Sequence, residues 1–360
     1  MRIIIVGGSN SLVRNGWTKY LPDHFPGEIV NLSIGATTTL TGIYRLLQGI
    51  TLQKGDVIVW EYAVNEIKHI ERGYVWKDLL KYIEYMIKIS RDAQAAFAPV
   101  IFTTKQEEMK AKRHPYFAGL IDLFSTYGVA YFDLSREYRA LHKVETAPEE
   151  IYRDAVHYAF DPILLNWIAG SVSDLAKRAN IPENPAEVYT GGSRVHLLND
   201  FTDGVFENSL LSIPTASLPK SIQLPEGGRI AAAYYLTYPD KPSAIRISLL
   251  SKDGKEYRRL RLSATNINGI RMPLLKSCAF EAGAKQEWQF AAGDRLRVRP
   301  AERGGKVYAE YETRASLPNQ LEPYTEGFCG FLVETPGSAP SSTARRGFLD
   351  RLKSRLARLV

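Results

Sequence analysis

Five short apolar segments alternate with longer amphipathic segments in the first half of the chain, and this alternation limits the folds open to it. The apolar segments are residues 2–6, 29–32, 56–62, 97–103 and 129–134. They show little two-residue alternation of polar and apolar side chains, which is typical of strands buried on both faces. Between them, residues 39–47, 75–96, 115–127 and 162–179 have the apolar spacing of helices. The pattern predicts an α/β domain over residues 1–182, with helices packed on a mainly parallel sheet.

The second half of the chain has a different texture. Short segments, many of them alternating, lie at 229–238, 244–251, 256–263, 287–292, 295–299, 306–313 and 328–334, with Gly, Pro, Asn and Asp between them. This spacing predicts an antiparallel β-sandwich or jelly roll over residues 188–335. Residues 336–344 are rich in Pro, Gly, Ser and Ala and predict a flexible linker.

The positive charge is concentrated at the end of the chain. The net charge is +7, and residues 345–360 hold six basic residues and one acidic residue, so this tail carries +5 and the rest of the chain +2. A body with so little excess charge does not indicate a nucleic-acid partner. Cys278 and Cys329 make neither a disulfide framework nor a metal cluster, and we expect both to be buried. The apolar strand begins at residue 3 and leaves no room for a signal peptide, so we expect a cytoplasmic protein.

Ser9 follows the first strand directly, in the stretch Gly7-Gly8-Ser9. Taken alone, such a serine most often caps a helix or completes a turn. The stretch lacks the lysine and the glycine spacing of phosphate-binding loops. A third role, as a nucleophile, needs an imidazole to accept the proton and an anion to orient that imidazole. Of the six histidines, only His157 has an aspartate three residues earlier, Asp154.

Taken together, the motifs resemble the SGNH (GDSL-like) esterases and acyltransferases over about residues 1–180. The four family blocks appear in order: a serine after the first strand, a glycine after the second, an asparagine after the third, and Asp-x-x-His near the end of the domain. In this chain they are Ser9, Gly35, Asn65 and the Asp154–His157 pair. The stretch from Gly7 to Trp17 is similar to members associated with bacterial polysaccharide synthesis.

The chain departs from the family pattern at two positions. Gly8 stands where the family usually has aspartate, and Ala63 stands where it usually has glycine. Neither change removes a residue that takes part in the chemistry. The methyl group of Ala63 would narrow the acyl pocket, and Gly8 would loosen the turn around Ser9.

The resemblance implies a flavodoxin-like, three-layer αβα domain and a role for each site residue. Ser9 would attack the acyl carbonyl, His157 would act as general base and acid, and Asp154 would orient His157. The oxyanion would be bound by the backbone N–H groups of Ser9 and Gly35 and by the side-chain amide of Asn65. The resemblance implies no metal and no bound cofactor, and acyl-CoA would be the donor if the enzyme is a transferase.

We therefore expect a serine-dependent ester hydrolase or O-acyltransferase that acts on an acylated sugar in cell-surface polysaccharide synthesis. The alternative is a glycan-binding or assembly protein on an SGNH scaffold that has lost its activity, which the two departures would explain.

Arg14, Trp17 and Glu66 are candidates for substrate contact, although a helix face with a buried Trp17 and a solvated Glu66 are the simpler interpretations. Four aromatic residues of the second domain could form a carbohydrate platform, although at strand spacing a core is favoured: Tyr234, Tyr235, Tyr238 and Trp288.

Residues 345–360 predict a basic amphipathic helix that holds the protein at the inner face of the plasma membrane. As a helix, the segment puts its large apolar residues on one stripe and its basic residues on the rest, as interfacial anchors do. The alternative is a helix that packs on the protein body or pairs with a partner in a coiled coil.

We expect the full-length protein to pellet with anionic vesicles and to be released at high salt. Each basic residue near an anionic leaflet contributes about 1 kcal/mol at low salt, and salt screens it. Liposome co-sedimentation measures this, with a protein truncated after Thr343 as the comparison. Equal binding by the two proteins, or binding by neither, would refute the anchor.

Overall fold

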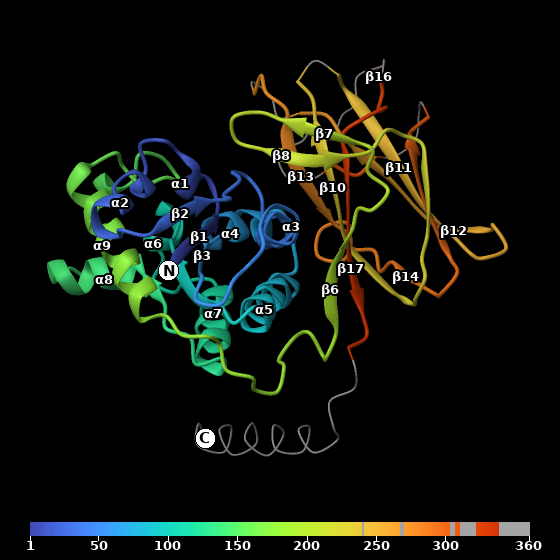
Figure 1. Cartoon of the computed structure of the whole chain (residues 1–360). Helices are drawn as coiled ribbons and strands as arrows, with labels where there is room; N and C mark the ends of the chain where they lie inside the picture. The colour runs from blue at the N-terminus through green and yellow to red at the C-terminus, as the bar shows by residue number, and fades with distance from the viewer. Residues whose placement is uncertain (240, 267–269, 303–306, 310–321, 338–360) are drawn as a thin grey trace.

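The computed structural model describes residues 1–239, 241–266, 270–302, 307–309 and 322–337, which form two domains (Figure 1). An αβα domain comes first, and a β-sandwich follows from Arg194. The predicted tail at 345–360 and most of the predicted linker at 336–344 lie outside the described residues. So does most of the strand predicted at 306–313.

The N-terminal domain is built on a five-stranded parallel sheet in the order β2-β1-β3-β4-β5. All of its strand pairs are parallel. Its strands are β1 (Arg2–Gly7), β2 (Glu28–Asn31), β3 (Val57–Glu61), β4 (Ala96–Ile101) and β5 (Phe132–Asp133). The central strands β3 and β4 are buried along their whole length, as the absence of polar alternation predicted. The expected flavodoxin-like fold with a mainly parallel sheet is confirmed, and its strand order is the one that flavodoxin-like folds have.

Helices cover both faces of this sheet. One core cluster joins the sheet to α3 (Thr39–Gly49), α4 (Ala63–Glu71), α5 (Trp76–Asp92) and α7 (Pro115–Thr126). A second cluster on the opposite face joins it to α2 (Leu21–His24) and α9 (Pro162–Arg178). Three further helices, too short for their periodicity to be evident in the sequence, lie at α1 (Ser9–Leu12), α6 (Lys105–Glu108) and α8 (Leu134–His142).

The second domain is a sandwich of two mainly antiparallel sheets. The first sheet has the order β13-β10-β17-β6, and its strands are β6 (Arg194–Leu198), β10 (Gly228–Thr237), β13 (Leu274–Ala279) and β17 (Phe328–Thr335). The second has the order β12-β11-β15-β9, and its strands are β9 (Lys220–Gln223), β11 (Ser243–Leu250), β12 (Glu256–Ser263) and β15 (Arg295–Pro300). Two short strands pair at the edges, β14 (Gln289–Phe290) with β10 and β16 (Glu322–Pro323) with β11. A separate hairpin joins β7 (Gly204–Glu207) to β8 (Ser212–Thr215).

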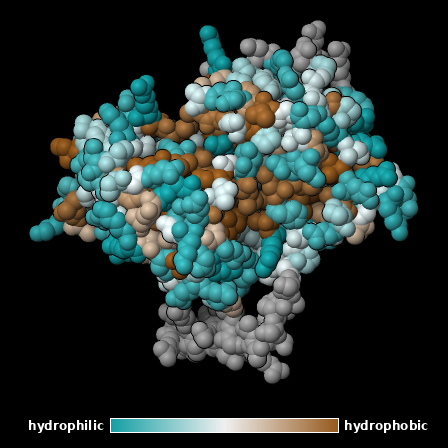
Figure 2. Space-filling view, in the orientation of Figure 1, coloured by the Kyte–Doolittle hydropathy of each residue, from teal (hydrophilic) through white to brown (hydrophobic). Residues whose placement is uncertain are grey.

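The first sheet of the sandwich packs against α3 and α5 of the N-terminal domain. Alternate residues of β10 face the two sides, because Tyr235 lies in the sandwich core and Tyr234 in the core shared with the helices. The Tyr234 hydroxyl donates a hydrogen bond to the Leu40 carbonyl at 2.8 Å, and its ring centroid lies 4.5 Å from that of Tyr44. In the space-filling view of Figure 2, hydrophobic residues gather in the middle of the visible surface. Tyr234, Tyr235 and Trp288 are fully buried. These three aromatic residues are therefore part of the core, as favoured above, and do not form a carbohydrate platform.

Polar contacts reinforce this interface. Lys81 on α5 lies 2.9 Å from Glu281 and 3.2 Å from Glu334 of the sandwich. The buried carboxylate of Glu84 accepts hydrogen bonds from three consecutive backbone N–H groups between the domains, at residues 188–190. The second domain is thus bonded to the helices that cover one face of the parallel sheet. Lys276 on β13 extends to the loop after β2, where its amine donates to the Ala36 carbonyl at 3.4 Å.

Two further expectations concern the chain as a whole. Cys278 and Cys329 are both buried, as predicted. In the part of the chain that the structure describes, no helix combines the length and the apolar character needed to cross a membrane.

Candidate active site

The strand order brings the first two site residues together. The chain leaves β1 toward β2 on one side and later returns to β3 on the other, so the connections after β1 and β3 diverge at the carboxyl ends of two adjacent strands. Such a switch point leaves a crevice at the sheet edge in open α/β folds. Ser9 is the first residue of α1, directly after β1, and Asn65 lies in the first turn of α4, directly after β3.

Ser9, His157 and Asp154 form a hydrogen-bonded chain. The Ser9 Oγ lies 2.7 Å from His157 Nε2, although 148 positions separate the two residues. On the other side of the ring, His157 Nδ1 lies 2.8 Å and 2.9 Å from the two carboxylate oxygens of Asp154. With Nδ1 protonated and donating to Asp154, Nε2 is free to accept the Ser9 proton. The predicted contact between Ser9 and His157 is therefore present.

A short hairpin-like segment carries Asp154 and His157. The N–H of Arg153 donates to the His157 carbonyl at 2.9 Å, and Tyr152 and Tyr158 pair as an isolated bridge with stacked rings. The Tyr158 hydroxyl binds the backbone N–H and carbonyl of Thr103, at the end of β4. These bonds tie the segment to the parallel sheet.

Asn10 holds this segment against the nucleophile helix. Its amide group donates to the Val156 carbonyl at 2.9 Å, and its carbonyl oxygen accepts from the Tyr158 N–H at 3.2 Å. The two bonds flank His157 on both sides in the sequence. This role of Asn10 was not predicted from the sequence. The only signal in the sequence was a polar residue next to the candidate nucleophile.

The carboxyl group of Asp154 is held in its ionised form. Partial burial opposes ionisation, but hydrogen bonds from the Val156 N–H, the His157 ring and the His157 N–H lower the pKa of Asp154 to about 2. The carboxylate is therefore charged over the whole neutral range. An anion in contact with Nδ1 stabilises the imidazolium that forms when His157 accepts a proton.

The backbone around Ser9 supplies hydrogen-bond donors. Ser9 N–H is at the first position of α1, where no intrahelical acceptor exists. Gly35 lies beside it, because a methyl group placed at Gly35 would be 3.4 Å from the Ser9 Cβ. Among the described residues, neither the Ser9 N–H nor the Gly35 N–H donates to a protein acceptor. We expect both to donate to an oxyanion formed at Ser9.

The side chain of Asn65 packs directly on Gly8. A methyl group placed at Gly8 would lie 2.0 Å from the Asn65 Oδ1 and 2.7 Å from its Cγ. This contact gives a physical reason for the glycine at a position where the family usually has aspartate, because any Cβ at Gly8 would displace the amide of Asn65. Gly8 therefore does more than loosen the turn: it makes room for a proposed oxyanion donor.

A buried carboxyl group lies beneath the nucleophile turn. Glu61, the last residue of β3, accepts hydrogen bonds through Oε2 from the Ser11 hydroxyl at 2.7 Å and the Gly8 N–H at 3.3 Å. Its Oε1 has no hydrogen-bond partner among the described residues. Burial raises the pKa of Glu61 to about 8, against the opposing effect of these two bonds. Sequence reasoning missed Glu61, although a carboxylate that closes an apolar strand was a signal.

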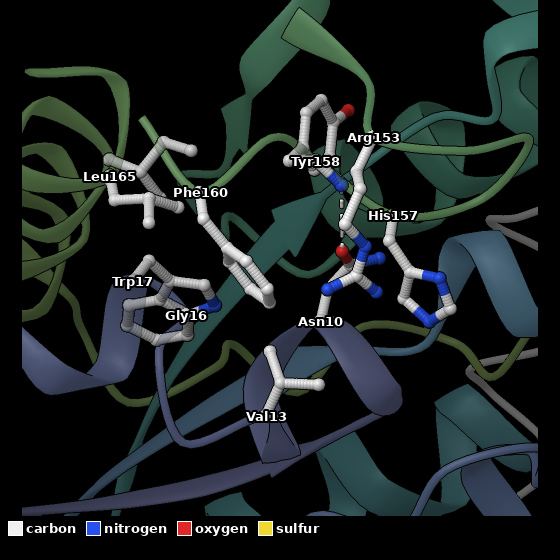
Figure 3. Close-up of a pocket in the computed structure, with 10 residues that line it drawn as sticks. Asn10, Val13, Gly16, Trp17, Arg153, His157, Tyr158, Phe160 and Leu165 are labelled. Atoms are coloured by element: carbon white, nitrogen blue, oxygen red, sulfur yellow. Dashed lines mark hydrogen bonds between the residues drawn. The ribbon is translucent and has the colours of Figure 1, made fainter. Parts of the chain in front are cut away.

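A small pocket opens beside His157. Trp17, Phe160 and Arg153 are among its lining residues, and the ring of Phe160 lies between Trp17 and Arg153 (Figure 3). The Arg153 guanidinium lies 4.3 Å from the Phe160 ring centroid. Trp17, expected as a substrate contact or as a buried residue, is both buried and part of the lining. Arg14 is exposed and lies outside the lining.

The expectation for Glu66 was wrong in both of its forms. Glu66 is fully buried, so it neither faces solvent nor is open to a substrate. One carboxylate oxygen accepts hydrogen bonds from the N–H and hydroxyl of Thr39, and the other accepts one from the Tyr116 hydroxyl. The residue joins α4 to α3 and α7 beneath the site. Glu66 lies in the first turn of α4, and its hydrogen bonds to Thr39 and Tyr116 hold its side chain in the interior.

No protein-family model matches this sequence, and no curated protein matches it either. Several solved structures are similar in fold. A member of the lipolytic G-D-S-L family from Veillonella parvula is 14% identical with a TM-score of 0.40, over 48% of this chain and 97% of that one. An esterase from a Pseudoalteromonas species is 16% identical with a TM-score of 0.37, over 49% and 96%. An acetylxylan esterase from Geobacillus stearothermophilus is 13% identical with a TM-score of 0.39, over 48% and 91%.

Replacing Gly8 by alanine should displace the Asn65 amide. We expect Gly8→Ala to lower the rate of ester turnover, up to the roughly 10²–10³-fold that loss of one oxyanion donor costs. In an Asn65→Ala background the same change should have little further effect, since the side chain that it displaces is gone. Steady-state kinetics of the four proteins measure this coupling. Gly49→Ala is the control, because no atom would lie within 4 Å of its new methyl group. Additive losses would contradict the contact.

Glu61 should make stability depend on pH. The pKa of its carboxyl group is about 8 in the folded protein and about 4.3 in the unfolded chain. Between these pH values the folded state therefore binds one proton more than the unfolded state. The free energy of unfolding contributed by Glu61 therefore falls as pH rises through this window. Glu61→Gln removes the titration and should lose less stability between pH 5 and pH 8 than the wild type. Urea unfolding at both pH values tests this, and an unchanged pH dependence would show that Glu61 is not responsible.

Proposed function

We propose that this protein is a serine-dependent acyl-ester enzyme of the SGNH type that works through an acyl-enzyme on Ser9. The observation that carries the proposal is the Ser9–His157–Asp154 chain, with its 2.7 Å and 2.8 Å contacts. A serine hydroxyl is activated when it is hydrogen-bonded to an imidazole and that imidazole is hydrogen-bonded in turn to an ionised carboxylate. The free N–H groups of Ser9 and Gly35 beside that hydroxyl add to the case.

The proposed reaction has two steps. The Ser9 oxygen attacks the acyl carbonyl while its proton passes to His157 Nε2, and the C–O bond to the leaving alcohol then breaks as His157 returns the proton to that oxygen. In the second step a water or an acceptor hydroxyl attacks the acyl carbon while its proton passes to His157 Nε2, and the C–O bond to Ser9 then breaks as His157 returns the proton to the Ser9 oxygen. The N–H groups of Ser9 and Gly35 and the Asn65 amide would bind the oxyanion in both steps.

The proposed substrate is an acylated sugar in cell-surface polysaccharide synthesis. Its support is the resemblance of the segment from Gly7 to Trp17, together with the aromatic and guanidinium groups around the pocket at His157. Hydrolysis and transfer use the same residues and differ in what deacylates Ser9. Incubation with acetyl-CoA and, separately, with acetylated sugars, followed by mass spectrometry, distinguishes a transferase from a hydrolase.

Substitution of the triad should abolish activity as a unit. We expect Ser9→Ala and His157→Ala to reduce ester turnover to a similar low level, because each removes the activated nucleophile. Asn65→Ala should be milder and retain some activity, since it removes one donor among three. A fluorophosphonate probe gives a second readout, with labelling of the wild type and none of Ser9→Ala. Turnover by Ser9→Ala at the wild-type rate would disprove the covalent mechanism, and failure of the folded wild type to label would favour a binding protein without activity.

A further inference from the structure

One outer face of the sandwich is lined with arginines that the proposed reaction does not use. Side chains alternate across a strand, and the inward residues of β11, β12 and β15 form the sandwich core. The opposite positions of these three strands hold six arginines: Arg246, Arg259, Arg261, Arg295, Arg297 and Arg299. We call this set the arginine face. It belongs to the sheet that does not pack on the N-terminal domain, and Figure 1 shows β11 and β12 on the side away from α1.

The strand register sets the arginines beside one another. Arg246 on the central strand β11 is paired with Arg261 on one side and with Arg299 on the other. In the next outward row, Ser248 lies between Arg259 and Arg297. Neighbouring strands are about 4.8 Å apart and successive outward residues about 7 Å apart, so the six guanidinium groups share a small area.

The face has few anions to balance this charge. Glu256 accepts hydrogen bonds from the Arg246 guanidinium at 2.8 Å and 2.9 Å, and the Glu302 carboxylate lies 3.1 Å from Arg299. Among the described residues, six arginines against these two carboxylates leave an excess of four positive charges, or of three when Asp294, which is bonded to Tyr257, is included. Arg259, Arg295 and Arg297 are exposed and have no ion pair among the described residues. Like charges directly opposite each other on a sheet are destabilising, so folding alone does not account for the arrangement.

We propose that the arginine face binds a carboxylate-bearing polysaccharide chain. The planar guanidinium group matches a carboxylate with two parallel hydrogen bonds, and several of them on a flat sheet suit an extended chain with repeated negative charges. The choice of a glycan rests on the proposed function, in which an acylated sugar is the substrate. Binding at this face would hold a polymeric substrate near the enzyme and raise its effective concentration at Ser9.

Two other polyanions fit the face less well. Single-stranded nucleic acid binding relies on aromatic side chains on which bases stack. The aromatic residue of β12, Tyr257, instead donates its hydroxyl to Asp294 at 2.6 Å. Insertion into a membrane surface needs large apolar side chains among the cations. Apart from Tyr257, no large hydrophobic residue is exposed on β9, β11, β12 or β15 within the described ranges.

Binding of polygalacturonate to the full-length protein tests the proposal, with neutral dextran as the ligand control. We expect the triple variant Arg259→Gln, Arg295→Gln and Arg297→Gln to weaken polygalacturonate binding about tenfold at low salt, since several exposed charge pairs each contribute modestly. The matched variant Lys54→Gln, Arg136→Gln and Arg178→Gln removes the same charge from exposed positions of the N-terminal domain and should change binding less than about twofold. The basic tail is common to both variants, so their difference reports the face.

Equal losses in the two triple variants, or no binding by the wild type, would overturn the proposal. Tighter binding of single-stranded DNA or anionic vesicles through the same three arginines would overturn the assignment to a glycan. Thermal unfolding checks the fold, and we expect the face variant to melt no lower than the wild type because like charges are removed. The single change Arg297→Glu, which should weaken binding more than Arg297→Gln, keeps the test independent of the triple variant. Turnover of a small ester should be unchanged in the face variant, so a protein without esterase activity would still give a readable binding result.

Discussion

The two hydrogen bonds of Asn10 join the parts of the N-terminal domain on which the site depends. Ser9 lies at the end of the first strand, and His157 lies in a segment that the chain reaches only after the whole sheet is built. Asn10 binds the backbone on either side of His157, so the imidazole is held over the nucleophile by the helix that begins with that nucleophile. The Tyr158 hydroxyl anchors the same segment to the end of β4. The contact between Ser9 and His157 therefore depends both on the sheet and on the segments that connect its strands.

Below this contact, buried carboxyl groups organise the turns at the carboxyl ends of the strands. Glu61 binds the turn that carries Ser9, and Glu66 joins the helix that carries Asn65 to two neighbouring helices. Burial raises the pKa of both groups, to about 8 and about 7, because the charged form is costly away from water. Hydrogen bonds to both oxygens of Glu66 and to one oxygen of Glu61 offset part of the cost of burying these groups. The site is thus positioned by side chains that never contact a substrate.

The β-sandwich contributes to the same region from the other side. Tyr234 binds the Leu40 carbonyl at the start of α3, and Lys276 binds the carbonyl of Ala36, one residue after Gly35. The loop with the proposed oxyanion donor is therefore held between its own sheet and the second domain. The two faces of the sandwich differ accordingly: one is apolar and covered by helices, and the other is charged and exposed.

The sequence by itself predicted the αβα domain and the sandwich, because buried strands and amphipathic helices leave local patterns. Its short motifs, through their resemblance to SGNH esterases, indicated Ser9, Gly35, Asn65, Asp154 and His157 as candidate site residues. It could not determine the environment of Glu66, the support from Asn10 and Glu61, or the contact between Gly8 and Asn65. Each of these depends on which side chains from distant segments meet in the interior. The arginine face is the clearest case: its residues are scattered over three strands, and only the register of the sheet sets them side by side. Tertiary structure decided these features because packing, burial and pairing act between residues that are far apart in the chain.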